Sequence, residues 1–367
     1  MNGKRTISLM HACFLIPASS YGGIVYLHSE VFRITQRQAW IAEFLGGLSL
    51  IPFAIWILYI FGKYPQKTIF EIIEINTGKL LARFFSVLYI GIMLVLSALA
   101  LRQFCAMILN YFLHTTPIIL IMAMTLLVSF FIASDGIENL ARTNLIMVLI
   151  AYPVFYVGQL IGLFKKFEWA NIFPIWEKDF QSFINASYLS TGLLSEMLLF
   201  LLIMAAYIHN PQKSYKGILV AMIVFEVFVP STVVLITQAV LGPEEAGHVA
   251  FAGINVAQTI SMGRFIQGME YFVITTYQVI ILAKLAINLF SAWNAFTFTL
   301  NSRKPSKLVL GFIAASVLIL CIYTVSYNQA NIYYIFMGRY VLIPFIFLIL
   351  LFTSFSILQK KRRNIDS

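Results

Sequence analysis

The chain has 367 residues, of which 60% are hydrophobic and only 11% are charged, and its formal net charge is +10. A soluble domain has about a quarter of its residues charged, so this composition excludes an ordinary soluble protein and predicts an integral membrane protein. The positive charge does not indicate nucleic-acid binding, because basic residues of membrane proteins gather in cytoplasmic loops. The three cysteines lie in apolar segments without metal-ligand or disulfide spacing, so we expect neither a metal nor another cofactor.

Ten apolar segments are long enough to cross a bilayer, at roughly 20 residues each. The loops between them are short, which predicts one membrane domain over residues 1–367 without a soluble module. The largest connections cover residues 63–79, 165–185 and 242–262. The predicted spans are residues 7–27, 38–62, 80–112, 115–133, 140–164, 186–208, 214–241, 263–296, 306–326 and 337–358.

Lysine and arginine residues are distributed unevenly between the two sides of these spans. With the N-terminus in the cytoplasm, the inner segments hold fifteen of them and the outer loops hold five. This bias follows the positive-inside rule. With ten spans, both termini are then predicted to be cytoplasmic. Residues 66–76 alternate apolar and charged residues in a helical pattern, which predicts a short helix lying on the inner membrane surface.

The first span contains Pro17 and the pair Gly22-Gly23 in an otherwise apolar stretch. Proline lacks a backbone N–H, and glycine readily adopts non-helical angles. This pattern predicts a helix unwound near its middle, and such broken helices hold the substrate in many transporters. The alternative is that these residues only kink an ordinary helix.

The sixth span opens with Ser190-Thr191-Gly192 and stands at the matching place in the second half of the chain. Two interrupted helices in corresponding places favour a transporter built from two repeats. We expect the repeats to cover residues 7–164 and 186–326, with an extra helix pair at 306–358. Freed backbone and side-chain groups would bind the polar ends of a small ligand, and helix N-termini would favour a carboxylate. These ligand-binding residues are Ser19, Ser20, Tyr21, Gly22, Gly23, Ser190, Thr191 and Gly192.

Ionisable residues inside spans are costly and indicate function. Glu196 and Glu226 stand within the sixth and seventh spans, and Glu270, Tyr277 and Lys284 recur every seven residues along the eighth. We expect Glu196, Glu270, Thr276 and Tyr277 to contact the ligand. Arg102, Glu226, Arg264 and Lys284 are expected as coupling or structural charges. The alternative is that these groups only pair with one another and fix helix packing. Glu43 lies near a predicted membrane border and is expected to reach the interface.

Catalytic signatures are missing from the sequence. It contains no His-Glu-x-x-His zinc motif, Gly-x-Ser-x-Gly elbow, phosphate loop or dinucleotide fingerprint, so we do not expect an enzyme.

The chain resembles the B subunits of bacterial spore-germination receptors, the endospore germination permeases of the amino acid–polyamine–organocation superfamily. The residues that carry the resemblance are Gly22-Gly23, Gly62–Thr68 with Glu71-Ile72-Ile73, Ser195-Glu196 and Arg264–Glu270. The resemblance implies an all-α, LeuT-like 5+5 inverted repeat with broken first and sixth helices. It also implies binding of a germinant (an amino acid, sugar or nucleoside) and a complex with an A-type subunit and a C-type lipoprotein subunit in the spore inner membrane.

Two functions therefore remain open. The first is a receptor subunit that binds a nutrient in a transporter-like cleft and signals to its partners. The second is a proton-coupled amino acid transporter, in which Glu196 or Glu270 carries the coupling proton.

Overall fold

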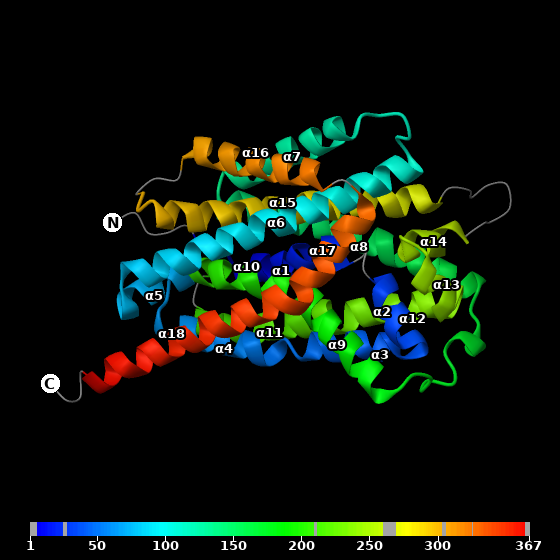
Figure 1. Ribbon diagram of the computed structural model, residues 1–367, viewed down its shortest axis with the longest axis horizontal. Coiled ribbons are helices and arrows are strands. Elements are labelled where there is room, and N and C mark those ends of the chain that lie inside the picture. The colour runs from blue at the N-terminus through cyan, green and yellow to red at the C-terminus, as the bar shows by residue number, and fades with distance from the viewer. Residues whose placement is uncertain are drawn as a thin grey trace.

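The computed structural model describes residues 6–24, 28–208, 211–259, 269–302, 306–324 and 326–363, although the side chains of 21–24, 165, 211–213, 269–270 and 360–363 are outside the described part. These residues are almost entirely helical (Figure 1), which confirms the all-α class. Within the described ranges the extended pairing is limited to an isolated bridge between Ile7 and Ile208.

The described residues form consecutive helices that are connected mostly by short segments. They are α1 (Leu9–Ile24), α2 (His28–Thr35), η1 (Gln36–Gln38), α3 (Ala39–Leu48), α4 (Ile51–Lys63), α5 (Ile69–Thr77), α6 (Lys79–Tyr111), α7 (Ile118–Ser134), α8 (Ile137–Lys165), η2 (Trp169–Asn171), α9 (Phe180–Leu194), α10 (Glu196–Met204), η3 (Ala205–Tyr207), α11 (Pro211–Met222), η4 (Ile223–Phe228), α12 (Val229–Leu241), α13 (Pro243–His248), α14 (Ala252–Gln258), α15 (Met269–Thr299), α16 (Lys307–Tyr323), α17 (Tyr327–Phe336), η5 (Met337–Leu342) and α18 (Ile343–Arg363).

Each of the ten predicted spans contains helix, but the number of membrane crossings is not confirmed as ten. Among the described residues, seven helices are long and apolar enough to cross a membrane, and three more apolar helices are shorter. The three short ones lie at Leu9–Ser20, Ile118–Ser134 and Lys307–Tyr323. The residue ranges of the two repeats stay a prediction.

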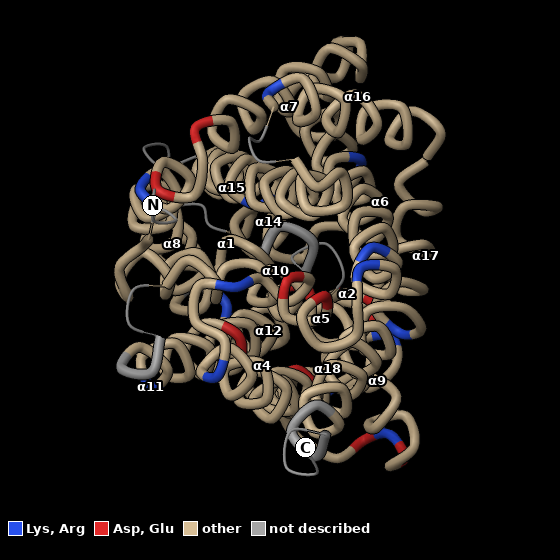
Figure 2. Tube along the Cα trace, turned by 90° about the vertical axis from the view of Figure 1, so that its left-hand side faces the viewer, with Lys and Arg blue, Asp and Glu red and all other residues tan. Residues whose placement is uncertain are grey.

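Long helices α6 and α15 pack together along the bundle, and α1 lies against α8, α11 and α15. Helix α5 and the end of α18 lie at one end of the bundle, at the left of Figure 1. Figure 2 looks onto that end and shows most helices end-on, with α5 and α18 close to each other. The lysine and arginine distribution predicts this end to be cytoplasmic, and we call it the inner end and the opposite one the outer end.

Helix boundaries that the sequence misplaced are set by capping side chains. Helix α9 begins at Phe180 rather than residue 186, because the Asp179 carboxylate accepts a hydrogen bond from the Ser182 N–H (3.3 Å) and caps it. The Ser182 hydroxyl also bonds Asp179, which lowers the pKa of this exposed carboxyl. Helix α17 begins ten residues before the predicted last span, since Ser326 caps it through the Gln329 N–H (3.2 Å).

The first helix is not unwound at Ser19–Gly23, contrary to the prediction. Helix α1 continues to Ile24 with Pro17 inside it. Neighbouring side chains satisfy the carbonyl groups near the proline: the Ser19 hydroxyl donates to Ile16 O (2.7 Å) and the Tyr152 hydroxyl donates to Pro17 O (3.2 Å). The residues between α1 and α2 lie outside the described part, so a break in this helix is not confirmed.

The sixth span is interrupted later and more briefly than predicted. Helix α9 continues through Ser190, Thr191 and Gly192, and only Ser195 separates it from α10. The Ser195 N–H bonds Thr191 O (3.0 Å) and its hydroxyl donates to Gly192 O (2.6 Å). Because these bonds keep the backbone satisfied, the chain bends here without opening.

Close glycine contacts hold the two π-helical turns, η4 and η5, against their neighbours. A side chain at Gly47 of α3 would collide with the backbone of Glu226 in η4, and one at Gly192 of α9 would collide with Gly338 in η5. π-Helical turns are rare and are frequent at functional sites. These contacts bring α3, α9, η4 and η5 together around the middle of the bundle.

The short helix predicted within residues 66–76 is present as α5, which packs on α6 and α18, and its place at the membrane surface stays a prediction. Its start is a capping box, in which the Thr68 N–H donates to the Glu71 carboxylate (2.6 Å) and the Glu71 N–H donates to the Thr68 hydroxyl (3.4 Å).

Candidate functional site

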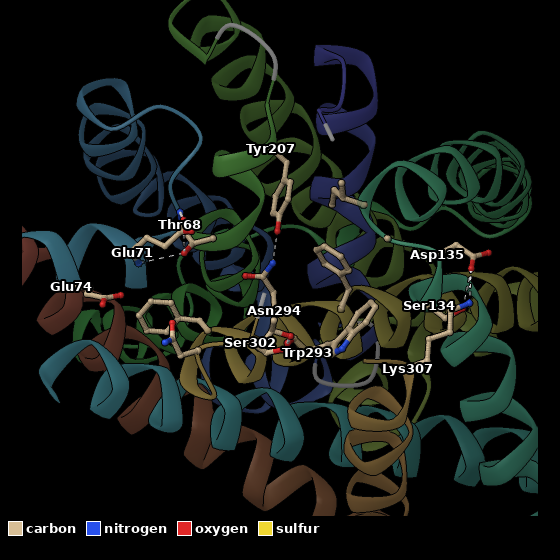
Figure 3. Close-up of a pocket in the computed structure, with 16 residues that line it drawn as sticks. Thr68, Glu71, Glu74, Ser134, Asp135, Tyr207, Trp293, Asn294, Ser302 and Lys307 are labelled. Carbon is tan, nitrogen blue, oxygen red and sulfur yellow. Dashed lines mark hydrogen bonds and ion pairs between the residues drawn. The ribbon is translucent and has the colours of Figure 1, made fainter. Parts of the chain in front are cut away.

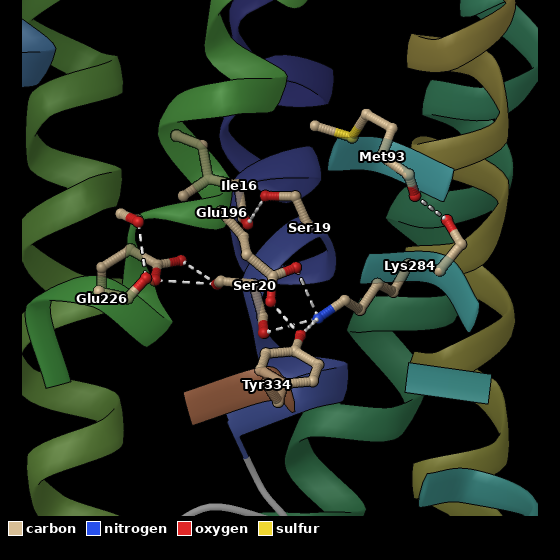
Figure 4. Close-up of polar contacts among 11 residues, drawn as sticks. Ile16, Ser19, Ser20, Met93, Glu196, Glu226, Lys284 and Tyr334 are labelled. Carbon is tan, nitrogen blue, oxygen red and sulfur yellow. Dashed lines mark hydrogen bonds and ion pairs between the residues drawn. The ribbon is translucent and has the colours of Figure 1, made fainter. Parts of the chain in front are cut away.

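The bundle interior contains a buried group of five polar residues, which we call the central polar cluster (Figure 4). They come from α1, α10, η4, α15 and α17, and are Ser20, Glu196, Glu226, Lys284 and Tyr334. All five are buried, and Lys284 and Glu226 have no solvent-exposed surface. Charged groups at such depth are expensive unless they are paired, so the arrangement of their partners determines which charges can exist.

Lys284 and Glu196 form a compensated pair. The Lys284 ammonium lies 2.8 Å from the Glu196 carboxylate and donates to the Tyr334 hydroxyl at 2.7 Å, while that hydroxyl donates to the second Glu196 oxygen. The ammonium also lies 3.5 Å from the backbone carbonyl of Ser20 on α1. One ion pair therefore links α10 and α15 directly, and includes α1 and α17 through hydrogen bonds.

Glu226 has a different environment on the other side of Ser20. The Ser20 hydroxyl lies 2.7 and 2.8 Å from its two carboxyl oxygens. One hydroxyl carries one hydrogen, so both short contacts are fully satisfied only when Glu226 carries a proton and donates to Ser20. None of the ion pairs among the described residues involves Glu226.

A second buried acid lies on the neighbouring helix α3. The Glu43 carboxylate accepts a hydrogen bond from the Ser190 hydroxyl (2.6 Å) and lies 3.7 Å from the His28 ring. Glu43 is 1% exposed, so the prediction that it reaches the membrane border is wrong. The close packing of Gly46 against Ser190 explains this, because it places the adjoining face of α3 inside the bundle.

The structure thus brings together four of the predicted residues, Ser20, Glu196, Glu226 and Lys284, and places Ser190 beside Glu43. The pairing partner of Lys284 is Glu196, which lies on another helix. Arg102, on α6, is only partly buried, and the Lys284–Glu196 pair forms without it.

Other predicted ligand residues make contacts within the bundle, and their role in ligand binding stays a prediction. The Ser19, Thr191 and Thr276 hydroxyls each donate to a carbonyl of their own helix, those of Ile16, Ser187 and Val273. Gly192 abuts Gly338. The Tyr277 ring packs on Phe155. The Arg264 residue and the side chains of Tyr21, Gly22, Gly23 and Glu270 lie outside the described residues.

Sequence reasoning missed Tyr334 and Glu43. Tyr334 precedes the last predicted span, in the region that the sequence assigns to an extra helix pair, although Tyr327, Asn331 and Tyr334 share one helical face there. This spacing of four and then three residues between polar side chains was the sequence signal that could have identified Tyr334 as a residue facing the bundle interior.

A pocket of about 700 Å³ lies at the inner end of the bundle, between α5, η3, the end of α15 and the α7–α8 turn (Figure 3). In its middle Asn294 of α15 donates a hydrogen bond to the Tyr207 hydroxyl of η3. Lys307 and Asp135 form an ion pair (3.0 Å) at one side, and Glu71 and Glu74 lie at the other. The pocket therefore opens on the side opposite to the outer loops and lies along the helix that carries Lys284.

A second pocket, of about 540 Å³, lies at the outer end between α2, α17 and the α13–α14 connection. Both volumes fall within the range of roughly 300–1,000 Å³ that small-molecule sites have. Within the described ranges, no three His, Cys, Asp or Glu side chains are placed to hold a metal ion.

Several known proteins are similar to this chain in sequence. A family model described as "Spore germination protein" matches residues 6–332. Spore germination protein KB of Bacillus subtilis (strain 168) is 26% identical over 339 residues, which cover 89% of this chain and 88% of that protein. Spore germination protein XB of Bacillus anthracis is 21% identical over 295 residues, with 79% and 80% covered.

Two solved transporters share the fold. A Na⁺-coupled sialic acid symporter in a substrate-bound, outward-open state superposes with a TM-score of 0.66 at 13% identity, covering 92% of this chain and 77% of the symporter. MhsT in complex with L-phenylalanine gives a TM-score of 0.60 at 12% identity, covering 96% and 100%. At this level of identity the likeness shows the LeuT-like fold and carries no information on the ligand.

Proposed function

The chain belongs to the spore germination protein family, and on this premise we propose that it is the membrane subunit of a spore nutrient receptor that senses a small germinant. The observation that supports the proposal most is the central polar cluster, in which groups from α1, α10, η4, α15 and α17 converge inside a transporter-like bundle. Transporters with such bundles hold their substrates at this depth, between helices of the two halves of the chain.

Ligand binding would act through the Lys284–Glu196 pair. A polar ligand that contacts Lys284, Glu196 or the Ser20 carbonyl competes with the bonds that link α1, α10, α15 and α17. A ligand that binds one arrangement of these helices more tightly than another increases the population of that arrangement. The size of the shift is set by the difference between the two affinities. The receptor would pass this shift to an A-type subunit and a C-type lipoprotein subunit in the spore inner membrane, with both termini of this chain in the cytoplasm. No enzymatic step is needed.

A second candidate is a proton-coupled amino acid permease. The specific observation in its favour is the contact of Ser20 with both oxygens of Glu226, which suits a neutral, proton-carrying acid next to a charged pair. This reassigns the coupling proton from Glu196 or Glu270 to Glu226. The inner-end pocket would then be part of the path by which a solute leaves.

Spores that carry Ser20→Ala or Lys284→Met, each compared with Ser316→Ala at verified receptor abundance, test the proposal. We expect the two cluster variants to change the nutrient preference or abolish the response to a panel of amino acids, sugars and nucleosides. Ser316→Ala serves as the control because the Ser316 hydroxyl, at a partly exposed position, donates to Phe312 O of its own helix α16 (2.9 Å). An unchanged response in both cluster variants contradicts the proposal.

Uptake separates the two candidate functions. The purified chain in proteoliposomes with a pH gradient should show no accumulation of the effective nutrient if it acts only as a receptor. Gradient-driven accumulation that Glu226→Gln abolishes would establish the permease instead.

A further inference from the structure

The outer-end pocket contains both signs of charge close together. Glu30 and Arg33, one turn apart on α2, line it with Nη1 of Arg33 3.4 Å from the Glu30 carboxylate. The side chains of Glu30 and Arg33 are 27% and 55% exposed, so this pair is solvated and contributes little to stability. A ligand that offers a carboxylate to Arg33 and an ammonium to Glu30 can therefore replace it at little cost.

Arg33 is held in a fixed position that leaves part of its guanidinium available. Its Nε donates to the carbonyl of Gly247 at the end of α13 (2.7 Å), which orients the planar group. A guanidinium has five N–H donors. The bond to Gly247 uses one and the contact with Glu30 uses another, so three remain, one on Nη1 and two on Nη2. One hydrogen from Nη1 and one from Nη2 together suit a carboxylate in fork geometry.

The α17 side of the pocket adds amide groups and an apolar edge. Asn328 and Asn331 bring side-chain amides, and Ile332 and Ile335, one turn apart, bring branched aliphatic side chains. A charged pair next to such an edge matches the two ends of an aliphatic α-amino acid. It offers less to a neutral sugar or nucleoside, which carries no pair of opposite charges to match Arg33 and Glu30.

The same two helices reach the buried polar groups below. On α17, Tyr327 and Asn331 line the pocket, and Tyr334, on the same helical face, bonds both Lys284 and Glu196. On α2, the first residue His28 is buried beside Glu43. Beneath Asn331 lies Gln103 of α6, which donates to it (2.7 Å) and whose buried Oε1 atom finds no hydrogen-bond partner among the described residues. The pocket thus lies directly above the central polar cluster along α17.

We infer that the outer-end pocket binds a zwitterionic α-amino acid with an aliphatic side chain, its carboxylate on Arg33 and its ammonium on Glu30, before the ligand acts on the central polar cluster. The inference rests on the proposed function, since it gives the nutrient class and its first contact. The ligand side chain lies against Ile332 and Ile335, and a ligand that pulls on α17 at Asn331 moves the helix that carries Tyr334.

Equilibrium binding to the purified chain in lipid nanodiscs tests this inference, with L-valine as the probe. Valinamide lacks the carboxylate, 3-methylbutanoate lacks the ammonium, and D-glucose and inosine represent the other nutrient classes. We expect the wild-type chain to bind L-valine, and both valine analogues to bind at least about tenfold more weakly, because each loses a charge-assisted hydrogen bond.

Variants then locate the site. Arg33→Gln and Glu30→Gln should each weaken L-valine binding about tenfold to a hundredfold. Arg33→Lys should recover part of the loss, because it keeps the charge but not the fork. The matched control is Arg37→Gln, which removes a positive charge at the same end from a residue that lies outside this pocket and pairs with Glu177 at 3.0 Å. It should leave the affinity unchanged. Asn328→Ala, at an exposed position, is the second variant that is not expected to disturb folding, and it should weaken binding less.

The outcomes separate the pocket from the proposed function. Loss of L-valine affinity in Glu30→Gln and Arg33→Gln but not in Arg37→Gln supports the pocket. Binding that survives both pocket variants but is lost in Ser20→Ala overturns the pocket and leaves the receptor proposal standing. Binding of D-glucose or inosine without L-valine, or no L-valine binding by the wild-type chain, also overturns the pocket. Failure of the receptor proposal is read separately, from an unchanged germination response of Lys284→Met spores.

Discussion

Glu196 and Glu226 lie on either side of Ser20 in the same buried region, yet they have opposite partners. Glu196 contacts the Lys284 ammonium at 2.8 Å and the Tyr334 hydroxyl, whereas Glu226 contacts the Ser20 hydroxyl with both oxygens. These partners favour a charged, compensated Glu196 and a neutral, protonated Glu226. The partners of a buried carboxyl group, and not its place in a span alone, therefore determine which protonation state it favours.

The largest expected effect comes from removing the cation. Lys284→Met leaves the Glu196 charge buried without its cation, which should destabilise the protein by about 3–5 kcal/mol. The apparent melting temperature of the purified chain in detergent measures this. Lys284→Met combined with Glu196→Gln should recover most of the loss, since no charge is left uncompensated. A single variant as stable as the wild type contradicts the charged assignment of Glu196.

Removal of the bridging hydroxyl should have a smaller effect. Tyr334→Phe keeps the buried ring but deletes hydrogen bonds to both members of the ion pair, at a cost of about 1.5–3 kcal/mol. Tyr333→Phe, at an exposed neighbouring position, is the matched control and should leave the melting temperature unchanged. Equal melting temperatures for the two variants would show that Tyr334 does not hold the pair.

A steric clash with the backbone of Glu226 tests how closely α3 approaches the helix turn that carries this acid. Gly47→Ala places a methyl group against the Glu226 carbonyl and Val227, so we expect a loss of about 1–3 kcal/mol. At Gly91 of α6 a methyl group would meet no atom within 4 Å, and Gly91→Ala should be neutral or slightly stabilising because alanine favours the helix. A similar melting temperature for both variants would contradict the close approach of α3 to η4.

The smallest effect is expected for Glu226→Gln. An amide resembles a protonated carboxyl group in shape and can still hydrogen-bond Ser20, so the melting temperature should change by the equivalent of less than about 1 kcal/mol. Glu196→Gln, which strands the Lys284 charge, should cost several times more. Equal losses in the two glutamine variants would remove the distinction between the two acids.

Composition and hydrophobic segments were sufficient to predict the fold class, because a bilayer requires long apolar helices with internally satisfied backbone. The presence of Glu196, Glu226 and Lys284 inside spans predicted that polar groups meet in the interior. The sequence could not predict that Lys284 pairs with Glu196, since this depends on which faces of α10 and α15 meet.

The prediction of an unwound first helix was wrong because the local residue composition was taken to determine the local backbone geometry. Pro17 and the serines near it predicted an unwound helix, but Ser19 and Tyr152 satisfy the nearby carbonyls and the helix continues. Spacing alone predicted Thr276 and Tyr277 in a ligand wall, which stays a prediction; the Thr276 hydroxyl donates to Val273 O and the Tyr277 ring packs on Phe155. Tyr334 escaped prediction because a tyrosine near a terminal span carries no charge that would single it out.

The most direct test of two differently ionised acids is the infrared spectrum of the purified chain in lipid at neutral pH. We expect a carbonyl band from a protonated carboxylic acid that loses a component in Glu226→Gln and keeps it in Glu196→Gln. A spectrum that is unchanged in Glu226→Gln, or that loses this component only in Glu196→Gln, would contradict the assignment of one charged and one neutral acid to the central polar cluster.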